Sequence, residues 1–491
     1  MSKPFYITTT LPYVNADPHI GFAFELISAD IVARHRQLAG DEVFFNTGTD
    51  EHGTKVWEKA KEAGKGTQAY TDEYAEKFKE LREPLGLLPT INFIRTTDPH
   101  HVAAAQEFWK CCLASGDIYK KHYRVRYCVG CELEKTDSEL VDGRCGVHPN
   151  QELQTREEEN YFFRLSKYQD ALLALYDANP DFVVPRFRLN EIRSLIQEKG
   201  LEDFSISRLK TKMPWGVPVP SDADHVMYVW FDALVNYISA IGWPRKANPN
   251  SPRGEPDDSS FRKWWIESGG VVQFAGKDQV RQQSVMWQAM LMSAKLPPSR
   301  QIVIHGFITS GGEKMSKSLG NVIDPLELVR EYGTDALRFY LARHVHPFED
   351  SDFTLEKFKE AYNADLANGI GNLTSRIMKM AETNLEQPVE VGGKFYPTLD
   401  YSREFESFDI QKAATIISTY ITGIDQIIQT HQPFKLVKED KVGGLKLIAD
   451  LVKMLYIVAD KVQVFMPKTS EKIKGLIMAN KMPSVPLFPR K

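Results

Sequence analysis

The sequence is poor in cysteine and has no long uninterrupted apolar run. It contains 5 cysteines among 491 residues, an odd number, and Cys111 and Cys112 are adjacent. Such a set makes a poor disulfide framework, which argues against a disulfide-stapled secreted domain. The most apolar stretch of the C-terminal part, residues 447–466, is interrupted by charged side chains, among them Lys453, Asp460 and Lys461. We therefore predict a core helix there and not a membrane span.

An excess of positive charge and a secretory signal are also missing. The formal net charge of -4 argues against a protein that coats nucleic acid non-specifically, although a local basic face would suffice for an RNA enzyme. The apolar residues after Pro4 are broken by the threonines at 8–10 and by Pro12, so no secretory signal is predicted. These absences predict a soluble, cytoplasmic protein. Because 491 residues exceed one compact domain, we expect two to four domains.

The N-terminal part has the pattern of a strand, a helix and a second strand. Residues 5–9 form a β-rich run, residues 21–39 have a helical pattern, and residues 43–46 form a second buried run. This βαβ unit predicts a parallel sheet that binds ligands at the C-terminal ends of its strands. Later runs of β-branched or aromatic residues have the same character, and they lie at 225–231, 271–274 and 302–306.

Two regions depart from this pattern. The cysteine cluster lies among charged residues between about 118 and 220, which indicates an insertion. After residue 350 the segments 355–380, 410–429 and 442–466 have helical spacing, which fits an antiparallel helix bundle. We therefore predict an α/β fold, with a Rossmann-like parallel-sheet domain in two halves, an inserted domain and an all-α domain. The predicted boundaries are 1–117 and 221–350 for the halves, 118–220 for the insertion and 351–491 for the helices.

Two pairs of metal-ligand residues lie close together in the insertion. Cys128 and Cys131 are separated by two residues, as are Cys145 and His148. Three thiols and an imidazole in two tight pairs are a ligand set that tetrahedral zinc prefers. Because the set is complete, we expect one structural Zn2+ per chain with no open catalytic position. The alternative, free thiols beside a surface histidine, has to explain both pairs by coincidence.

Two short motifs have the chemistry of a phosphate site. His19 and Gly21 lie where the first strand meets the first helix, and a helix N-terminus presents free backbone N–H groups to an anion. Lys314 and Lys317 lie on a glycine-flanked loop that can close over a polyphosphate and neutralise charge that develops at its α-phosphate. Each motif alone also fits a bland alternative, a turn with a surface histidine or a solvated basic loop. The two motifs together indicate a phosphate site far more specifically than either motif alone.

With these motifs the chain resembles the class I aminoacyl-tRNA synthetases, whose signatures are a His-Ile-Gly-His motif and a Lys-Met-Ser-Lys-Ser loop. The counterparts here are His19-Ile20-Gly21-Phe22 and Lys314-Met315-Ser316-Lys317-Ser318. Further matches narrow the resemblance to the methionyl family, and the resemblance extends over nearly the whole chain. These matches are Leu11–Asn15, Thr47–Gly53 and Tyr228–Leu234.

The resemblance implies a ligase that activates L-methionine with ATP, accompanied by Mg2+, and transfers the methionyl group to initiator and elongator tRNA-Met. It implies that Asp50 holds the α-ammonium group of methionine. The implied pocket is lined by Leu11, Tyr13, Asp50, Trp230, Ala233 and Tyr237. For ATP, the resemblance implies that His19 and Lys317 steady the triphosphate. Gly21 would lie against adenine and Asp278 would hold the ribose.

The same resemblance places the anticodon site in the helical region, and implies that Asn368, Asn372 and Arg376 face the CAU anticodon. Asn372 and Arg376 are four residues apart and therefore share a helix face. Amide and guanidinium groups can read the edges of unpaired bases. Phe434 stands where the family commonly has a tryptophan that stacks on an anticodon base. A bare Asn-x3-Arg pattern also occurs on solvated helix faces, so this assignment rests on the resemblance.

The chain departs from the family pattern at two positions near the substrates. Phe22 replaces the second histidine of the first motif, which removes one donor to phosphate or ribose. Gln283 stands where the family usually has a histidine in the methionine pocket, and an amide donates a hydrogen bond but does not titrate. Because His19, Asp50 and Lys317 are retained, an active ligase is the favoured interpretation.

Two other functions remain as alternatives. A class I synthetase of the cysteinyl type has a cysteine shortly before its histidine motif, but no cysteine precedes Cys111. A non-catalytic tRNA-binding paralogue would keep the fold, and the signature lysines and Asp50 argue against it. The family's frequent C-terminal dimerising appendage has no room in this chain, so we expect a monomer.

Overall fold

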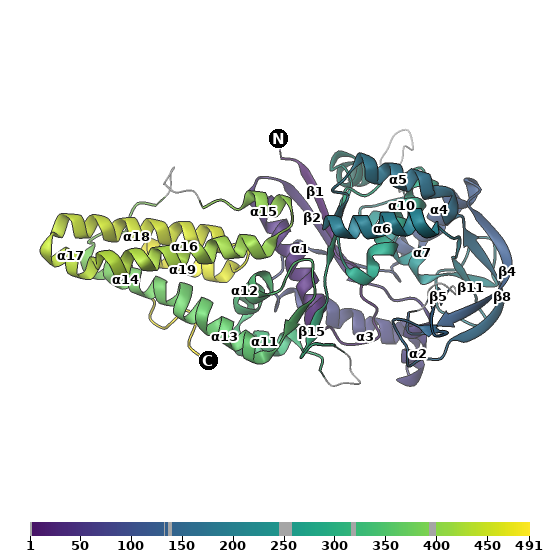
Figure 1. Ribbon diagram of the computed structural model, residues 1–491, viewed down its shortest axis with the longest axis horizontal. Coiled ribbons are helices and arrows are strands. Elements are labelled where there is room, and N and C mark those ends of the chain that lie inside the picture. Colours follow the sequence, from purple (N-terminus) through teal and green to yellow (C-terminus); the bar gives the residue numbers. More distant parts are fainter. Residues whose placement is uncertain (1, 132, 136–139, 245–257, 316–320, 392–398) are drawn as a thin grey trace. The chain divides into compact units, whose positions relative to one another are not determined.

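The computed structural model of the chain describes residues 2–131, 133–135, 140–244, 258–315, 321–391 and 399–491 (Figure 1). The chain forms two compact units, each built from segments that are distant in the sequence. The first unit consists of Met1–Pro18, Gly40–Glu80 and Thr90–Ile304, and the second of His19–Ala39, Leu81–Pro89 and His305–Lys491. The first long helix therefore belongs to the second unit, whereas the strands before and after it belong to the first.

A six-stranded parallel sheet lies in the first unit. In spatial order its strands are β3 (Asn92–Arg95), β2 (Glu42–Thr49), β1 (Pro4–Thr8), β13 (Val271–Gly276), β14 (Gln301–His305) and β9 (Val183–Val184). β1 pairs in parallel with β2 on one side and with β13 on the other. β1 and β13 are buried along nearly their whole length, and their sequences therefore do not alternate between apolar and polar residues. The predicted α/β fold with a Rossmann-like parallel sheet is confirmed.

The first unit also contains helices, and those that follow residue 98 share one apolar core with the sheet. The longer helices of this unit are α2 (Thr54–Glu62), α3 (Thr67–Lys79), α4 (Pro99–Ala114), α5 (Gln169–Ala178), α6 (Arg186–Lys199) and α10 (Trp287–Ser293). Shorter helical turns are η3 (Leu165–Tyr168), α9 (Ser259–Phe261), η4 (Arg262–Glu267), η5 (Lys277–Gln279) and η6 (Gln282–Met286). The turn η1 (Glu80–Arg82) belongs to the second unit except for its first residue. Phe108 of α4 stacks on Trp287 of α10 with ring centroids 5.6 Å apart. Leu172 of α5 and Ile192 of α6 belong to the same core, although both helices arise within the predicted insertion. The boundaries of the insertion therefore stay a prediction.

The region of the cysteine cluster has an antiparallel sheet of its own. Its strands, in order, are β10 (Phe204–Ser205), β8 (Gln154–Phe163), β4 (Ile118–Cys128) and β5 (Leu133–Lys135). The pairing of β4 with β8 extends from Ile118 opposite Phe163 to Tyr127 opposite Gln154. A small hairpin of β6 (Leu140–Val141) and β7 (Arg144–Cys145) follows β5. This Cys/His-containing insert is the second predicted part of the fold, and it is confirmed.

The run at 225–231, predicted as one strand, contains a strand and the start of a helix. β12 (His225–Met227) pairs antiparallel with β11 (Ser207–Leu209), and the chain then turns into α7 (Val229–Ala233) and α8 (Asn236–Ser239). Trp230 and Phe231 are buried on α7. A short apolar run is compatible with a buried strand and with a buried helical turn, so its composition alone could not separate the two. The strand prediction was wrong for residues 229–231.

The second unit begins with α1 (Ile20–Leu38), and its other elements follow β14. A three-stranded sheet is formed by β16 (Glu313–Lys314), β15 (Ile308–Ser310) and β17 (Ser351–Phe353), with α11 (Pro325–Tyr332) and α12 (Thr334–His344) between them in sequence. The helical part consists of α13 (Leu355–Ala361), the π-helical segment η8 (Tyr362–Gly371), α14 (Asn372–Asn384), α15 (Ser402–Glu406), α16 (Ile410–His431), α17 (Pro433–Glu439), α18 (Lys441–Val462) and α19 (Pro467–Ala479). The predicted C-terminal helical region is confirmed.

The apolar spacing of the sequence explains these helices. In α16, Ile417, Ile421, Ile424 and Ile428 recur at three- and four-residue intervals and are buried along one stripe. Pro467 is the first residue of α19, a position where its missing N–H is not needed.

Buried charges anchor α1 within the second unit. The guanidinium of Arg338 on α12 donates to the carboxylate of Asp30 on α1 at 2.7 Å and to the carbonyls of Val464 and Phe465 at 3.0 and 2.9 Å. Arg34 donates to the same carboxylate at 2.7 Å. A buried guanidinium with a full set of acceptors fixes the elements that supply them. α1 is thereby tied to α12 and to the segment that follows α18.

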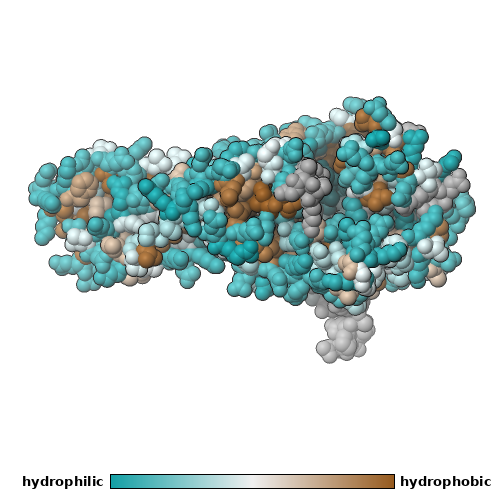
Figure 2. All heavy atoms as spheres, turned by 90° about the horizontal axis from the view of Figure 1, so that it is seen from below, coloured by the Kyte–Doolittle hydropathy of each residue, from teal (hydrophilic) through white to brown (hydrophobic). Residues whose placement is uncertain are grey.

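Among the helices that the structure describes, none combines the length and apolar character that a membrane span requires. Figure 2 shows one face of the molecule, on which hydrophilic residues cover most of the surface and apolar residues form separate patches.

Candidate active site and metal centre

The loop after β1 lies against the end of β2 and brings Tyr13 beside Asp50. The N–H of Asp50 donates to the carbonyl of Pro12 at 2.9 Å, and the N–H of Val14 donates to the carbonyl of Asp50 at 3.3 Å. Tyr13 and Asp50 thus form a parallel bridge that extends the pairing of the two strands. The Asp50 side chain is buried, with 2% of the residue exposed. A buried carboxylate at the C-terminal end of a parallel strand is suited to holding a cationic ligand group.

Aromatic side chains lie next to this carboxylate. The rings of Tyr13 and Trp230 meet edge to face, with centroids 6.1 Å apart. The indole N–H of Trp230 has no acceptor within the part of the chain that the structure describes, which leaves it available to a ligand. Ala233 lies in the next turn of α7 and is buried, while Leu11 is half-buried in the loop. The structure therefore places Tyr13 next to both Asp50 and Trp230, and the role of these residues in binding methionine stays a prediction.

Tyr237 and Gln283 lie deeper in the same unit. The hydroxyl of Tyr6 donates to the carbonyl of Tyr237 at 2.8 Å, and the Tyr237 ring packs against Trp287 at 5.8 Å. The side-chain oxygen of Gln283 accepts a hydrogen bond of 2.6 Å from the amide of Gln273 on β13. This bond fixes the amide where the family usually has a histidine. Asp278, predicted to hold ribose, is exposed on η5 directly after the C-terminal end of β13.

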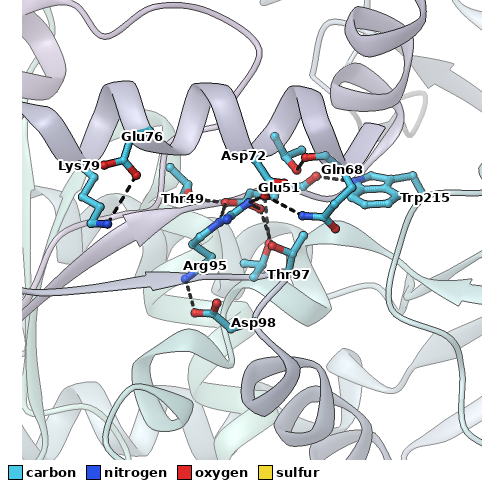
Figure 3. Close-up of polar contacts among 12 residues, drawn as sticks. Thr49, Glu51, Gln68, Asp72, Glu76, Lys79, Arg95, Thr97, Asp98 and Trp215 are labelled. Atoms are coloured by element: carbon cyan, nitrogen blue, oxygen red, sulfur yellow. Dashed lines mark hydrogen bonds and ion pairs between the residues drawn. The ribbon is translucent and has the colours of Figure 1, made fainter. Parts of the chain in front are cut away.

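A second buried carboxylate, which the sequence analysis missed, follows Asp50 directly (Figure 3). Arg95 of β3 binds both oxygens of Glu51 at 2.7 and 2.8 Å, and Thr49 and Thr97 donate to the same carboxylate at 2.7 and 2.5 Å. The hydrogen bonds that Arg95 donates to Glu51 raise the pKa of Arg95 above its ordinary value, although burial acts in the opposite direction. Glu51 is thereby fully paired, and the segment that carries Asp50 is fastened to β3.

A third carboxylate, also missed, lies between two buried histidines. Nδ1 of His52 is 2.7 Å from Oδ2 of Asp232, and Nε2 of His101 is 2.9 Å from Oδ1. Nδ1 of His101 is 2.9 Å from the hydroxyl of Ser239. Burial raises the pKa of Asp232, but the charges and hydrogen bonds of the two histidines outweigh it and lower the pKa below its ordinary value. The carboxylate is therefore ionised near neutral pH.

In the second unit, His19 caps the N-terminus of α1. The N–H of Gly21 donates to Nδ1 of His19 at 3.1 Å, so the neutral imidazole carries its proton on Nε2. A Cβ at Gly21 would lie 3.0 Å from this ring, which is why glycine suits the position. Burial of the imidazole among protein atoms lowers the pKa of His19 below its ordinary value. A neutral N–H donor at a helix N-terminus can bind a phosphate oxygen.

Phe22 and the lysine loop complete the nucleotide motifs. Phe22 is buried on α1, so a packed aromatic ring takes the place of the family's second histidine. Lys314 ends β16, and its side chain lies outside the described part of the chain; Lys317 falls within residues 316–320 and lies outside it altogether. The role of both lysines stays a prediction.

The predicted metal ligands form one cluster. The ligand atoms of Cys128, Cys131, Cys145 and His148 all lie within 4.8 Å of one another. Sγ of Cys131 is 3.4 Å from Sγ of Cys145 and 3.1 Å from Nδ1 of His148. A tetrahedral zinc ion with bonds of about 2.3 Å to sulfur holds its sulfur ligands about 3.8 Å apart, so this compact group of side chains could hold a metal ion. A Cβ at Gly130 would meet the His148 ring at 2.6 Å, so the knuckle needs a glycine there.

The anticodon candidates lie on or near two helices of the second unit. Asn372 is exposed at the start of α14, and Phe434 is 47% exposed at the start of α17. Arg376 is half-buried and forms an ion pair with Asp425 of α16. The side-chain oxygen of Asn368 on η8 accepts two hydrogen bonds from Arg490, at 2.6 and 3.0 Å. Asn372 and Phe434 are thus open to a partner, while Arg376 and Asn368 have partners within the chain.

Comparison with known proteins shows similarity to one family. The family model described as "tRNA synthetases class I (M)" matches residues 5–152 and 131–378. The methionine–tRNA ligase of Thermotoga maritima is 40% identical over 98% of this chain and 76% of its own length, and that of Thermosynechococcus vestitus is 46% identical over 78% and 70%. The structure of Mycobacterium tuberculosis methionyl-tRNA synthetase in complex with methionyl-adenylate is similar with a TM-score of 0.89, 36% identity and coverage of 99% and 100%.

Proposed function

The chain belongs to the methionine–tRNA ligases of the class I aminoacyl-tRNA synthetases, and from this premise we propose that Asp50, Tyr13 and Trp230 form its methionine pocket. The observation that carries the proposal is the parallel bridge between Tyr13 and Asp50, which sets a buried carboxylate beside two aromatic rings. A carboxylate can bind the α-ammonium group, and aromatic walls favour an unbranched thioether. Leu11, Ala233, Tyr237 and Gln283 complete the proposed lining.

Methionine analogues test this assignment directly. Methionine without its α-amino group keeps the thioether and the carboxylate, but it has no partner for Asp50. It should bind at least about thirtyfold more weakly than methionine, because a buried charge would lose its counter-ion. Methioninol, which keeps the amino group, should lose less affinity. Calorimetric titration measures the affinity for each analogue. If the deaminated analogue bound as tightly as methionine, Asp50 would not be part of the pocket.

The proposed reaction needs alignment and charge stabilisation, with no covalent intermediate on the protein. The methionine carboxylate attacks the α-phosphate of ATP, which gives methionyl-adenylate and pyrophosphate. The terminal hydroxyl of tRNA-Met then attacks the carbonyl carbon of the adenylate, which forms the methionyl ester and releases AMP. His19 would donate from Nε2 to a phosphate oxygen, Gly21 would lie against adenine, and Asp278 would accept from the ribose. Lys314 and Lys317 would neutralise phosphate charge, and Mg2+ bound with ATP would share that task.

We propose that the Cys/His cluster holds one structural zinc ion. Purified protein should contain one zinc ion per chain. The Cys128→Ser variant should contain no zinc, and its residues 118–163 should become sensitive to proteolysis. Binding to such sites contributes roughly 10–16 kcal/mol in zinc-finger peptides, so its loss unfolds the local structure. Cys111→Ser is the matched control, because that thiol lies on α4 outside the cluster. Elemental analysis measures the zinc content of each protein, and a folded wild-type protein without zinc would contradict the proposal.

We propose that α14 and α17 bind the anticodon loop of initiator and elongator tRNA-Met. Asn372→Ala and Arg376→Ala should each weaken aminoacylation by roughly 1–3 kcal/mol, a magnitude known for base-edge contacts. Both should leave pyrophosphate exchange nearly unchanged, because exchange needs no tRNA. The expected loss lies in KM for tRNA.

Thr419→Ala on α16 serves as a control for this pair. Its hydroxyl is exposed and donates at 3.0 Å to the carbonyl of Thr415 in its own helix. We expect no effect on either reaction. Unchanged aminoacylation in Asn372→Ala and Arg376→Ala would place the anticodon site elsewhere, and equal loss of both reactions would indicate damage to the fold.

Three thiol ligands need a reducing compartment, so we propose that the chain acts in the cytoplasm.

A further inference from the structure

Asp232 joins three elements that surround the proposed methionine pocket. One carboxylate oxygen contacts His52, which lies two residues after Asp50 at the end of β2. The other oxygen contacts His101 on α4. Asp232 itself lies on α7 between Trp230 and Ala233. The carboxylate is fully buried and therefore connects the segment that carries the pocket's charge to the helix that carries its aromatic wall.

The charge of this carboxylate also determines the protonation of both histidines. An ionised carboxylate accepts hydrogen bonds and cannot donate, so His52 must carry a proton on Nδ1 and His101 on Nε2. The other ring nitrogen of His101, Nδ1, lies 2.9 Å from the hydroxyl of Ser239 on α8, which can donate or accept. An amide at position 232 could accept from only one of the two rings with its oxygen. The other ring would face an N–H group and would have to change its tautomer or turn away.

We propose that Asp232 is a positioning residue for methionine binding, which sets the separation between the Asp50 carboxylate and the Trp230 indole. This inference rests on the proposed pocket and extends it to a residue that need not touch the substrate. The neighbouring Glu51 network fastens the same segment to β3 on its other side, as Figure 3 shows. The segment 50–52 is therefore held by two buried carboxylates, and only Asp232 also holds the aromatic wall.

The chain offers a matched control in Asp117. Its side chain is also fully buried, and it accepts from Lys167, Tyr168 and Ser293 in the same unit. Those partners belong to η3 and α10 and to no element of the proposed pocket. Asp117→Asn and Asp232→Asn make the same chemical change in the same kind of environment. General damage should therefore be similar in both variants, while damage to the pocket should be confined to the second.

The experiment is steady-state pyrophosphate exchange with full-length wild type, Asp232→Asn and Asp117→Asn, together with thermal unfolding of each protein. For Asp232→Asn we expect the KM for methionine to rise at least about tenfold, with kcat lowered less than about threefold, because displaced walls weaken binding in the ground state and the transition state alike. The KM for ATP should change less than about twofold. Asp117→Asn should leave all three constants near wild type, even where it lowers the melting temperature.

If Asp232→Asn does not yield folded protein, His101→Ala and His101→Gln replace it. The alanine variant should raise the KM for methionine, and glutamine, which can still donate to Asp232, should restore it. The inference is overturned if Asp232→Asn and Asp117→Asn have the same KM for methionine. In the substitute experiment, it is overturned if His101→Ala and His101→Gln have the same KM for methionine. Wild type without methionine-dependent exchange would instead overturn the proposed function, so the two failures are distinguishable.

Discussion

Asp50→Asn should lower kcat/KM for methionine activation by roughly 30- to 5000-fold. Removing one partner of a buried charge pair typically costs about 2–5 kcal/mol, and each 1.36 kcal/mol corresponds to about a factor of ten. Asparagine keeps the shape of the side chain, and the backbone bonds of residue 50 to the loop after β1 do not involve the carboxylate. The loss should therefore reflect the missing charge and appear mainly in KM for methionine. Pyrophosphate exchange at varied methionine concentration measures it.

Asp72→Asn supplies the control for this prediction. Asp72 lies on α3, its side chain is 50% exposed, and it binds Arg95 at 2.6 Å. An exposed carboxylate contributes little, so exchange should stay within about threefold of wild type. Similar losses in both variants would mean that Asp50 contributes to folding and not to substrate binding.

Lys317→Ala should reduce methionine-dependent exchange by about 10²–10³-fold while the affinity for methionine changes little. The lysine is assigned to charge that grows at the phosphates in the transition state, and losing one such group typically has this effect on kcat. Measuring exchange and methionine binding on the same preparation separates chemistry from binding. Lys359→Ala, an exposed lysine on α13, should behave as wild type. A loss smaller than about tenfold would make the loop a solvated lid without a part in the chemistry.

Local signals in the sequence predicted the parts of this molecule that depend on local chemistry. The buried runs at β1, β2, β13 and β14 predicted the parallel sheet because strands covered on both faces cannot alternate with polar residues. The two ligand pairs predicted the metal cluster because metal geometry limits their spacing, and the four side chains do converge.

Such local signals could not predict contacts between segments that are distant in the sequence. Asp232 and His101 are separated by more than a hundred residues, and neither position shows in sequence that the other is its partner. The pairing of Glu51 with Arg95 was missed for the same reason, although Glu51 lies within a segment that carried the family resemblance. Residues 225–231 show a related limit, because burial explains their composition equally well in β12 and in α7.

The most direct test of the account is ATP–pyrophosphate exchange with the purified chain and each of the twenty amino acids in turn. If the Asp50 pocket selects an unbranched thioether with an α-ammonium group, methionine should support exchange, and each of the other natural amino acids should give less than about a hundredth of that rate. Exchange supported by cysteine instead would identify a different synthetase. No exchange with any amino acid would identify a non-catalytic paralogue that keeps the fold, and either result would contradict the assignment of the pocket.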